Sequence, residues 1–114
     1  MGRIGGNTVC RFQICQTRKN PMGEAEKIWA TATECVGWLN LQSGDSKYER
    51  FKAKTEESTH IFICDFSPKI SELSGYDVRA IIKDAVYDVL LVDDPMELGE
   101  HLEIYLRRVG AWNG

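Results

Sequence analysis

Apolar and polar residues alternate with a period of two along most of the chain, most clearly in its C-terminal third. In residues 77–82, Val78, Ala80 and Ile82 share one parity, whereas both parities of residues 86–92 are largely apolar. Successive side chains of a strand point to opposite faces. The first pattern therefore predicts a strand with one buried face, and the second predicts a strand in the interior of the sheet.

Residues 101–109 extend this pattern to a three-stranded meander. Leu102, Ile104 and Leu106 form the apolar parity of this segment, and its other parity is predicted to meet water or a partner. The connection at residues 83–85 is short enough to require an antiparallel hairpin, although it lacks an Asn-Gly pair.

Strand-like alternation also appears in residues 9–16, 27–41 and 59–66. In residues 27–41 the predicted core parity includes Val36 and Trp38, and Glu34 shares that parity, which indicates a register shift near it. Gly37 lies within the same pattern and suggests a bulge or a sharp bend. The sequence therefore predicts six strands in all.

The segments between these strands carry turn residues. Asn20-Pro21 and Gly23 predict a loop over residues 17–26, and residues 67–76 are expected to hold at most one helical turn, through residues 70–73. Asp93-Asp94-Pro95 is the sequence of a turn. Residues 1–7 and 110–114 are expected to be flexible tails.

Hydrophobic periodicity disappears over residues 42–58, where about half of the positions are charged. A long loop in so small a domain is uncommon and is usually functional or ordered by binding, although an idle solvated loop or a short helix would fit the same residues. This candidate loop consists of Gln42, Ser43, Gly44, Asp45, Ser46, Lys47, Tyr48, Glu49, Arg50, Phe51, Lys52, Ala53, Lys54, Thr55, Glu56, Glu57 and Ser58.

Six strands with almost no helix are best accommodated by an antiparallel sheet closed into a small β-barrel or a rolled sandwich, because closure removes exposed edges; the small antiparallel β-barrel is the predicted fold. At 114 residues the chain is expected to form a single domain over residues 1–114. It has no apolar run of about 20 residues and no apolar signal-peptide core. No membrane association is therefore expected. The protein is expected to be made in a cytoplasm.

The net charge of -3 argues against a protein that binds nucleic acid by neutralising phosphates. The aromatic residues and the small barrel leave an OB-like nucleic-acid-binding module as an alternative. A mildly acidic wall is compatible with a conduit that surrounds a DNA duplex without binding it specifically.

Candidate chemistry is sparse, and neither catalysis nor a cofactor nor a metal site is predicted. Cys10, Cys35 and Cys64 lie in strand-like runs and read as reduced core thiols, without Cys-x-x-Cys spacing. His60 reads as a structural histidine. A hydrolase would need a nucleophile, a base and oxyanion donors in one place, and the sequence offers no such set.

Several short segments resemble a known family. They are Thr55-Glu56-Glu57-Ser58-Thr59-His60-Ile61-Phe62, Tyr87-Asp88-Val89, Val92-Asp93-Asp94-Pro95 and His101-Leu102-Glu103-Ile104-Tyr105-Leu106. With the order of the predicted elements, they resemble the small head-completion or head-tail connector proteins, the adaptors and stoppers of tailed bacteriophages. The resemblance extends over about residues 9–109.

This resemblance implies a non-enzymatic virion protein at the head-tail junction. It would assemble as a ring, dodecameric in the virion, beneath the portal protein. It would extend or close the DNA channel and bind a tail or tail-completion protein, and residues 42–58 are the candidate channel loop. A tail-completion or tail-terminator protein remains an alternative role.

The polar parity of the last predicted strand, with the residues that follow it, is the candidate assembly interface. Its residues are His101, Glu103, Tyr105, Arg107, Arg108 and Trp112. For Trp112, a ring folded back onto its own barrel is an equally good expectation.

Overall fold

A computed structural model describes residues 4–41 and 58–112, which form six strands and three short helical segments. The strands are β1 (Thr8–Lys19), β2 (Ala25–Leu41), β3 (His60–Asp65), β4 (Val78–Ile82), β5 (Ala85–Asp93) and β6 (His101–Ala111). The helical segments are α2 (Pro68–Ser71), η2 (Glu72–Gly75) and η3 (Pro95–Glu97). The predicted mainly β fold with little helix is confirmed.

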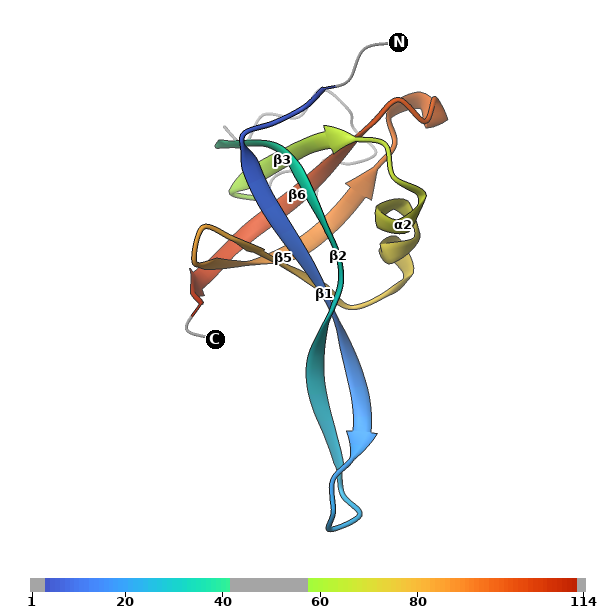
Figure 1. The fold of residues 1–114 in the computed structure, drawn as a ribbon, viewed down its shortest axis with the longest axis vertical. Helices are drawn as coiled ribbons and strands as arrows, with labels where there is room; N and C mark the ends of the chain where they lie inside the picture. The colour runs from blue at the N-terminus through green and yellow to red at the C-terminus, as the bar shows by residue number, and fades with distance from the viewer. Residues whose placement is uncertain (1–3, 42–57, 113–114) are drawn as a thin grey trace.

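The six strands close into one antiparallel ring in the order β1-β2-β3-β6-β5-β4, so that they form a small barrel (Figure 1). Closure is made where residues 11–14 of β1 pair with residues 78–81 of β4. As predicted, β5 is an interior strand of the meander, between β4 and β6.

The predicted alternation places the core inside this ring. Leu102, Ile104 and Leu106 of β6 are completely buried, and so are Phe12 of β1 and Phe62 of β3. Beside the barrel, α2 and η2 add Ile70 and Leu73 to the same core. At most one helical turn, through residues 70–73, was expected in this connection, whereas α2 and the 3-10 segment η2 follow each other over residues 68–75.

Along β2 the inward-facing parity changes at Ala32. Phe12 of β1 pairs with Thr33 and Gln13 pairs with Thr31, so Ala32 is the extra residue of a bulge. A shift was predicted near Glu34, two positions later. As a result the prediction that Val36 and Trp38 face the core is wrong, since they are 48% and 42% exposed.

Gly37 does not mark a bulge, because the β1–β2 pairing ends at it and the β2–β3 pairing begins at it without a register shift there in either. A Cβ atom at this position would overlap the Ile63 carbonyl oxygen, and it would lie 2.7 Å from the ring of Phe62. The glycine is required for close packing, and the predicted bulge is absent at this residue.

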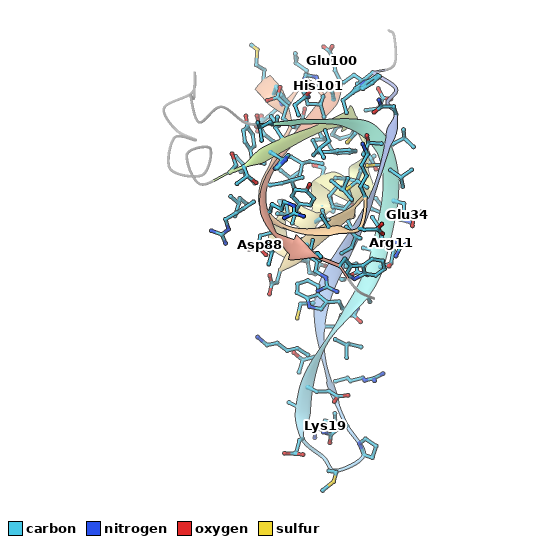
Figure 2. All side chains as sticks on the ribbon, turned by 90° about the vertical axis from the view of Figure 1, so that its left-hand side faces the viewer. Arg11, Lys19, Glu34, Asp88, Glu100 and His101 are labelled. Carbon is cyan, nitrogen blue, oxygen red and sulfur yellow. The ribbon has the colours of Figure 1, made fainter. Side chains whose placement is uncertain are left out.

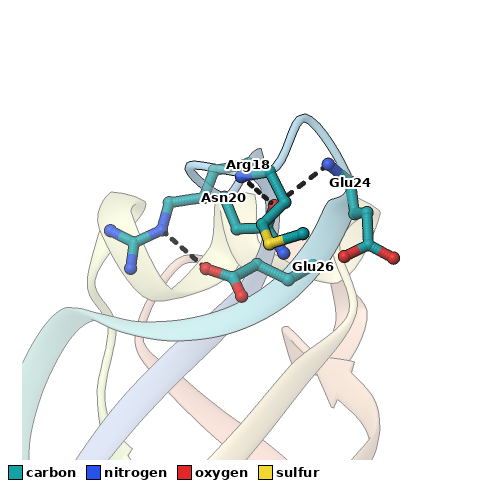
Figure 3. A network of polar contacts seen from close by, with 5 residues as sticks. Arg18, Asn20, Glu24 and Glu26 are labelled. Atoms are coloured by element: carbon teal, nitrogen blue, oxygen red, sulfur yellow. Dashed lines mark hydrogen bonds and ion pairs between the residues drawn. The ribbon is translucent and has the colours of Figure 1, made fainter.

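The predicted loop over residues 17–26 is also wrong. The strands β1 and β2 stay paired as far as Lys19 and Ala25. The Asn20 side chain accepts hydrogen bonds of 3.0 Å from the backbone N–H groups of Met22 and Glu24, and Gly23 has a φ of 84° (Figure 3). Turn chemistry therefore occupies residues 20–24 alone. The polar residues on either side form strands that meet water on both faces, so no apolar alternation marks them.

Two further connections show their turn chemistry. Lys83 and Asp84 both have positive φ, 48° and 62°, as a two-residue type I′ hairpin requires. Asp94 accepts a 3.0 Å hydrogen bond from the N–H of Gly99 through its side chain, so the turn predicted at Asp93-Asp94-Pro95 is confirmed. Among the described residues, no helix is long and apolar enough to cross a membrane.

The ends of the described chain are hydrogen-bonded to the barrel. The N–H groups of Ile4 and Gly5 donate to the Asp65 carboxylate at 2.7 and 3.3 Å. The Trp112 N–H donates to the Asp84 carbonyl at 2.9 Å. Flexible tails were expected over residues 1–7 and 110–114; of these, residues 1–3 and 113–114 lie outside the described residues.

Candidate assembly surfaces

The most prominent surface feature is the arm, defined as residues 16–28 of the β1–β2 hairpin. Pairing of β1 with β4 ends at Ile14, beyond which β1 and β2 pair with each other. The molecule therefore measures 50 Å along its longest axis but 29 and 25 Å along the others. Figure 1 shows the arm projecting from the barrel, and Figure 2 shows Lys19 near its end.

Side chains at the base of the arm attach it to the barrel. The guanidinium of Arg79, on β4, lies 4.4 Å from the centre of the Trp29 ring on β2. The Arg79 Nε–H also donates to the side-chain oxygen of Gln13 at 2.8 Å. Three strands are thereby joined where the hairpin leaves the ring, which sets the direction of the arm.

Most of the arm beyond this base is exposed. Arg18 and Glu26 form a 3.3 Å ion pair across the two strands (Figure 3). At the tip, Met22 is 83% exposed. Surface ion pairs contribute about 0–1 kcal/mol each, and an isolated two-stranded hairpin is marginally stable in water. The arm therefore gains little stability from its own contacts.

A second exposed feature is the apolar patch, defined as Val9, Val36 and Trp38 on the outer wall of β1 and β2. Val9 and Val36 are directly paired across the strands, and Val9 is 56% exposed. The Trp38 Nε1–H donates to the Ile4 carbonyl at 3.0 Å, which orients the ring. Sequence analysis missed this patch because the bulge at Ala32 reverses the facing of β2.

The ion pair of Arg11 and Glu34 lies next to the apolar patch, with 3.1 Å between its nearest atoms (Figure 2). The Arg11 guanidinium also lies 5.4 Å from the centre of the Trp112 ring. Trp112 is thus folded onto its own barrel, as the second of the two expectations for it proposed.

The other predicted interface residues are engaged within the chain. Glu103 accepts hydrogen bonds from Tyr105 at 3.2 Å and contacts His101 at 3.1 Å. Tyr105 is 5% exposed, so its ring is not a surface group. Arg107 pairs with Asp88 at 2.9 Å. Arg107 and Arg108 are the exposed members of the predicted set.

Residues 42–57 of the predicted channel loop lie outside the described residues. Ser58, its last member, is described and is buried.

A hollow of about 630 Å³ opens at the end of the barrel near the N-terminal segment, and Cys35 and Cys64 line it together with Asp65 and Glu100. Cys64 is buried and Cys35 is partly buried. All four cysteines of the chain are free thiols. Within the described part of the chain, no group of three or more potential ligands is placed to hold a metal ion.

His60, at the start of β3, packs its ring edge-on against Tyr87, with 5.2 Å between the ring centres. Its Nδ1 lies 2.9 Å from the Thr59 hydroxyl oxygen. Burial lowers the pKa of His60, and the positive charge of Arg108 lowers it further. These contacts are those of a packed structural residue.

A small closed barrel that presents a projecting arm and an apolar patch has the features of an assembly protein. The chain matches the family model described as phage head completion protein over residues 1–109, and it belongs to the phage head completion protein family. The family resemblance found in the sequence is confirmed. Members of this family are structural virion proteins, so the chain is a structural phage protein. No curated protein matches the chain.

Proposed function

We propose that the chain completes the phage head by assembling as a ring beneath the portal protein. The ring extends or closes the DNA channel and provides the surface to which a tail or tail-completion protein attaches. The arm is the observation that carries this proposal. It extends past the last β1–β4 pair, and most of its residues are exposed.

A ring supplies the missing contacts of the arm. Cyclic assemblies repeat one head-to-tail interface in which two different surfaces of the same chain meet. The arm of one copy is one such surface, and the apolar patch on the wall of the barrel is suited to be another. Apolar patches with exposed aromatic rings are typical of protein interfaces.

The DNA-facing part of the proposal rests on charge. The chain carries a net charge of -3, and Arg11, Arg18 and Arg107 are each paired with a carboxylate. Arginines engaged in this way are poor ligands for phosphates, and DNA in the channel is surrounded without specific binding. Residues 42–58, in which about half of the positions are charged, are the proposed channel loop.

Complementation of a phage that lacks this gene tests the proposal. Without the protein, electron microscopy is expected to show filled heads that lose DNA or fail to join tails. Heads that keep their DNA and take tails normally would contradict the function.

A matched pair of variants tests the arm. Met22→Glu at the tip is expected to abolish complementation. The control is Met96→Glu on η3, which is expected to complement and changes a methionine of nearly equal exposure, 81% against 83%. The purified variants should unfold at the same temperature as the wild type. Equal titres for the two variants would show that the arm is not an assembly element.

The alternative role as a tail-completion protein differs in its binding partner. Co-purification with the portal protein supports the proposed position, and co-purification with the tail tube instead would support the alternative.

A further inference from the structure

Both long edges of the arm lack a neighbouring strand. On one side, β1 pairs with β4 only over residues 11–14, and on the other, β2 pairs with β3 only over residues 37–41. In the part of the chain that the structure describes, no strand pairs with the outer edge of residues 16–19 or of residues 25–28. Such an edge is a row of unpaired N–H and C=O groups, which is a template for strand pairing with another chain.

The backbone hydrogen bonds show which residues present these groups. Opposite residues of an antiparallel pair exchange bonds at every second pair. At the tip, the Asn20 N–H donates across the arm to the Glu24 carbonyl at 2.8 Å. At the base, the Cys15 N–H donates away from β2, to the Asp77 carbonyl at 3.0 Å. The alternation between these two bonds turns four residues outward, Thr17 and Lys19 on β1 and Ala25 and Lys27 on β2.

The two edges of the arm carry complementary charges. Arg18 of β1 and Glu26 of β2 are directly opposite each other and form the 3.3 Å ion pair. Their side chains are 64% and 40% exposed, so each has room for a second partner on its outer side. Opposite charges placed directly across a strand pair stabilise it. The β1 edge of one arm therefore suits the β2 edge of another, whereas two β1 edges would bring basic side chains together.

We propose that the arms of neighbouring copies pair edge to edge, β1 of one copy beside β2 of the next, with Arg18 opposite Glu26. The inference rests on the proposed ring and names the partner of the arm within it. Cyclic symmetry points every arm to the same end of the ring, so adjacent β1 and β2 strands run antiparallel. In this register the outward backbone groups of Thr17 and Lys27 of adjacent copies face each other.

Paired arms would form one continuous β-barrel that lengthens the DNA channel, and its closure would remove the free edges. With strands about 4.8 Å apart, the two-stranded arms of a dodecamer would enclose a circle roughly 37 Å across, or more if the strands tilt. Barrels of about 16–18 strands already hold an aqueous channel. The exposure of residues 16–19 on both faces fits such a wall, which has water inside and outside. The pairing uses the edges of the arm alone, so the apolar patch can make a separate contact.

Disulfide trapping in assembled particles tests the pairing. Thr17→Cys and Lys27→Cys, each in a Cys15→Ser chain, are expressed together in cells infected by the phage that lacks this gene. The Cα atoms of the two introduced cysteines would be about 5.5 Å apart, within disulfide range. After oxidation of the purified particles, about half of the chains should run as dimers on a non-reducing gel, since random order places the two cysteines face to face at about one interface in four.

Each variant expressed alone is the control, because its introduced cysteine then has no cysteine at the opposite edge. Both controls should stay monomeric on the gel. Dimers from either variant alone would show that like edges meet. Particles that keep their DNA and take tails without the cross-link would overturn the pairing while the proposed function stands. Particles that mature without incorporating the chain would overturn both.

A second pair of variants separates the backbone edge from the side chain. Lys27→Pro removes the outward N–H and leaves the β1–β2 bonds in place, and proline is accepted at strand edges whose N–H faces solvent. It is expected to abolish complementation at an unchanged melting temperature. Lys27→Ala removes the same charge but keeps the N–H, and it is expected to complement. Equal titres for the two variants would overturn the pairing.

Discussion

At Gly37 the packing of the barrel leaves no room for a side chain. Its neighbours are the Ile63 carbonyl, which is held in the β2–β3 ladder, and the ring of the buried Phe62. A backbone oxygen cannot move aside as a flexible side chain can. Gly37→Ala is therefore expected to lower the free energy of unfolding by about 1–3 kcal/mol, measured by chemical denaturation.

Gly110 supplies the control for that experiment. It is also a strand glycine, in β6, and nothing lies within 4 Å of the Cβ it would acquire. Gly110→Ala is expected to leave the free energy of unfolding unchanged within about 0.5 kcal/mol. An equal loss in both variants would show that backbone freedom, and not the overlap at Gly37, governs the effect.

His60 makes the stability of the protein depend on pH. Its folded-state pKa lies below the ordinary value of 6.5, first because of burial and then because of Arg108. Below that ordinary value the unfolded chain therefore binds more protons than the folded chain. The melting temperature is expected to fall as pH falls through about 6.5, and to level off below the folded pKa.

A comparison with His60→Gln isolates this contribution, because glutamine does not titrate. The difference in melting temperature between wild type and variant should narrow or reverse as the pH is lowered from about 7.5 to about 5. Parallel pH profiles for the two proteins would show that other groups cause the dependence.

At the scale of elements, the arm depends on its base. Arg79 stacks on Trp29 and donates to Gln13, and these contacts join β4 to both strands of the hairpin. Arg79→Ala is expected to speed amide hydrogen exchange in residues 16–28 by roughly tenfold, because a cation–π contact and a hydrogen bond together are worth about 1–2 kcal/mol.

Arg18→Ala is the matched control, since it removes an arginine from an exposed ion pair on the arm itself. Surface pairs contribute little, so exchange should change less than about threefold. Exchange in β5 and β6 should be the same in both variants. Faster exchange throughout the barrel after Arg79→Ala would mean that the residue supports the whole fold and not the arm alone.

At the scale of the whole molecule, stability comes from one core closed by the β1–β4 pairing. Phe12 is completely buried in that core, and its strand supplies one side of the closure. Phe12→Ala is expected to cost about 3–5 kcal/mol. The whole free energy of unfolding of a domain of this size is about 5–15 kcal/mol. The variant should therefore unfold at a much lower denaturant concentration, in a transition that tryptophan fluorescence and circular dichroism report together.

Met22→Ala at the tip of the arm should change the free energy of unfolding by less than about 0.5 kcal/mol. Were the two probes to separate in the wild type, the arm and the barrel would unfold independently, and the molecule would not be a single cooperative unit.

The sequence alone determined the architecture wherever a strand has one wet and one dry face. Leu102, Ile104 and Leu106 alternate with polar residues, and all three are buried as expected. The same alternation located β4, β5 and the inward face of β1, and short motifs identified the family. Apolar residue types favour burial, and the buried face of a strand recurs at every second position.

Tertiary structure alone decided the features that depend on what packs against a residue. The arm is strand on both sides of Asn20, yet water on both of its faces removes the apolar signal. The bulge at Ala32 places Val36 and Trp38 on the outer face of β2. Arg79 contacts Trp29, although 50 residues separate them in the sequence. A period of two records which neighbours alternate, but it contains no information about where one residue is inserted or which distant side chain fills the space opposite.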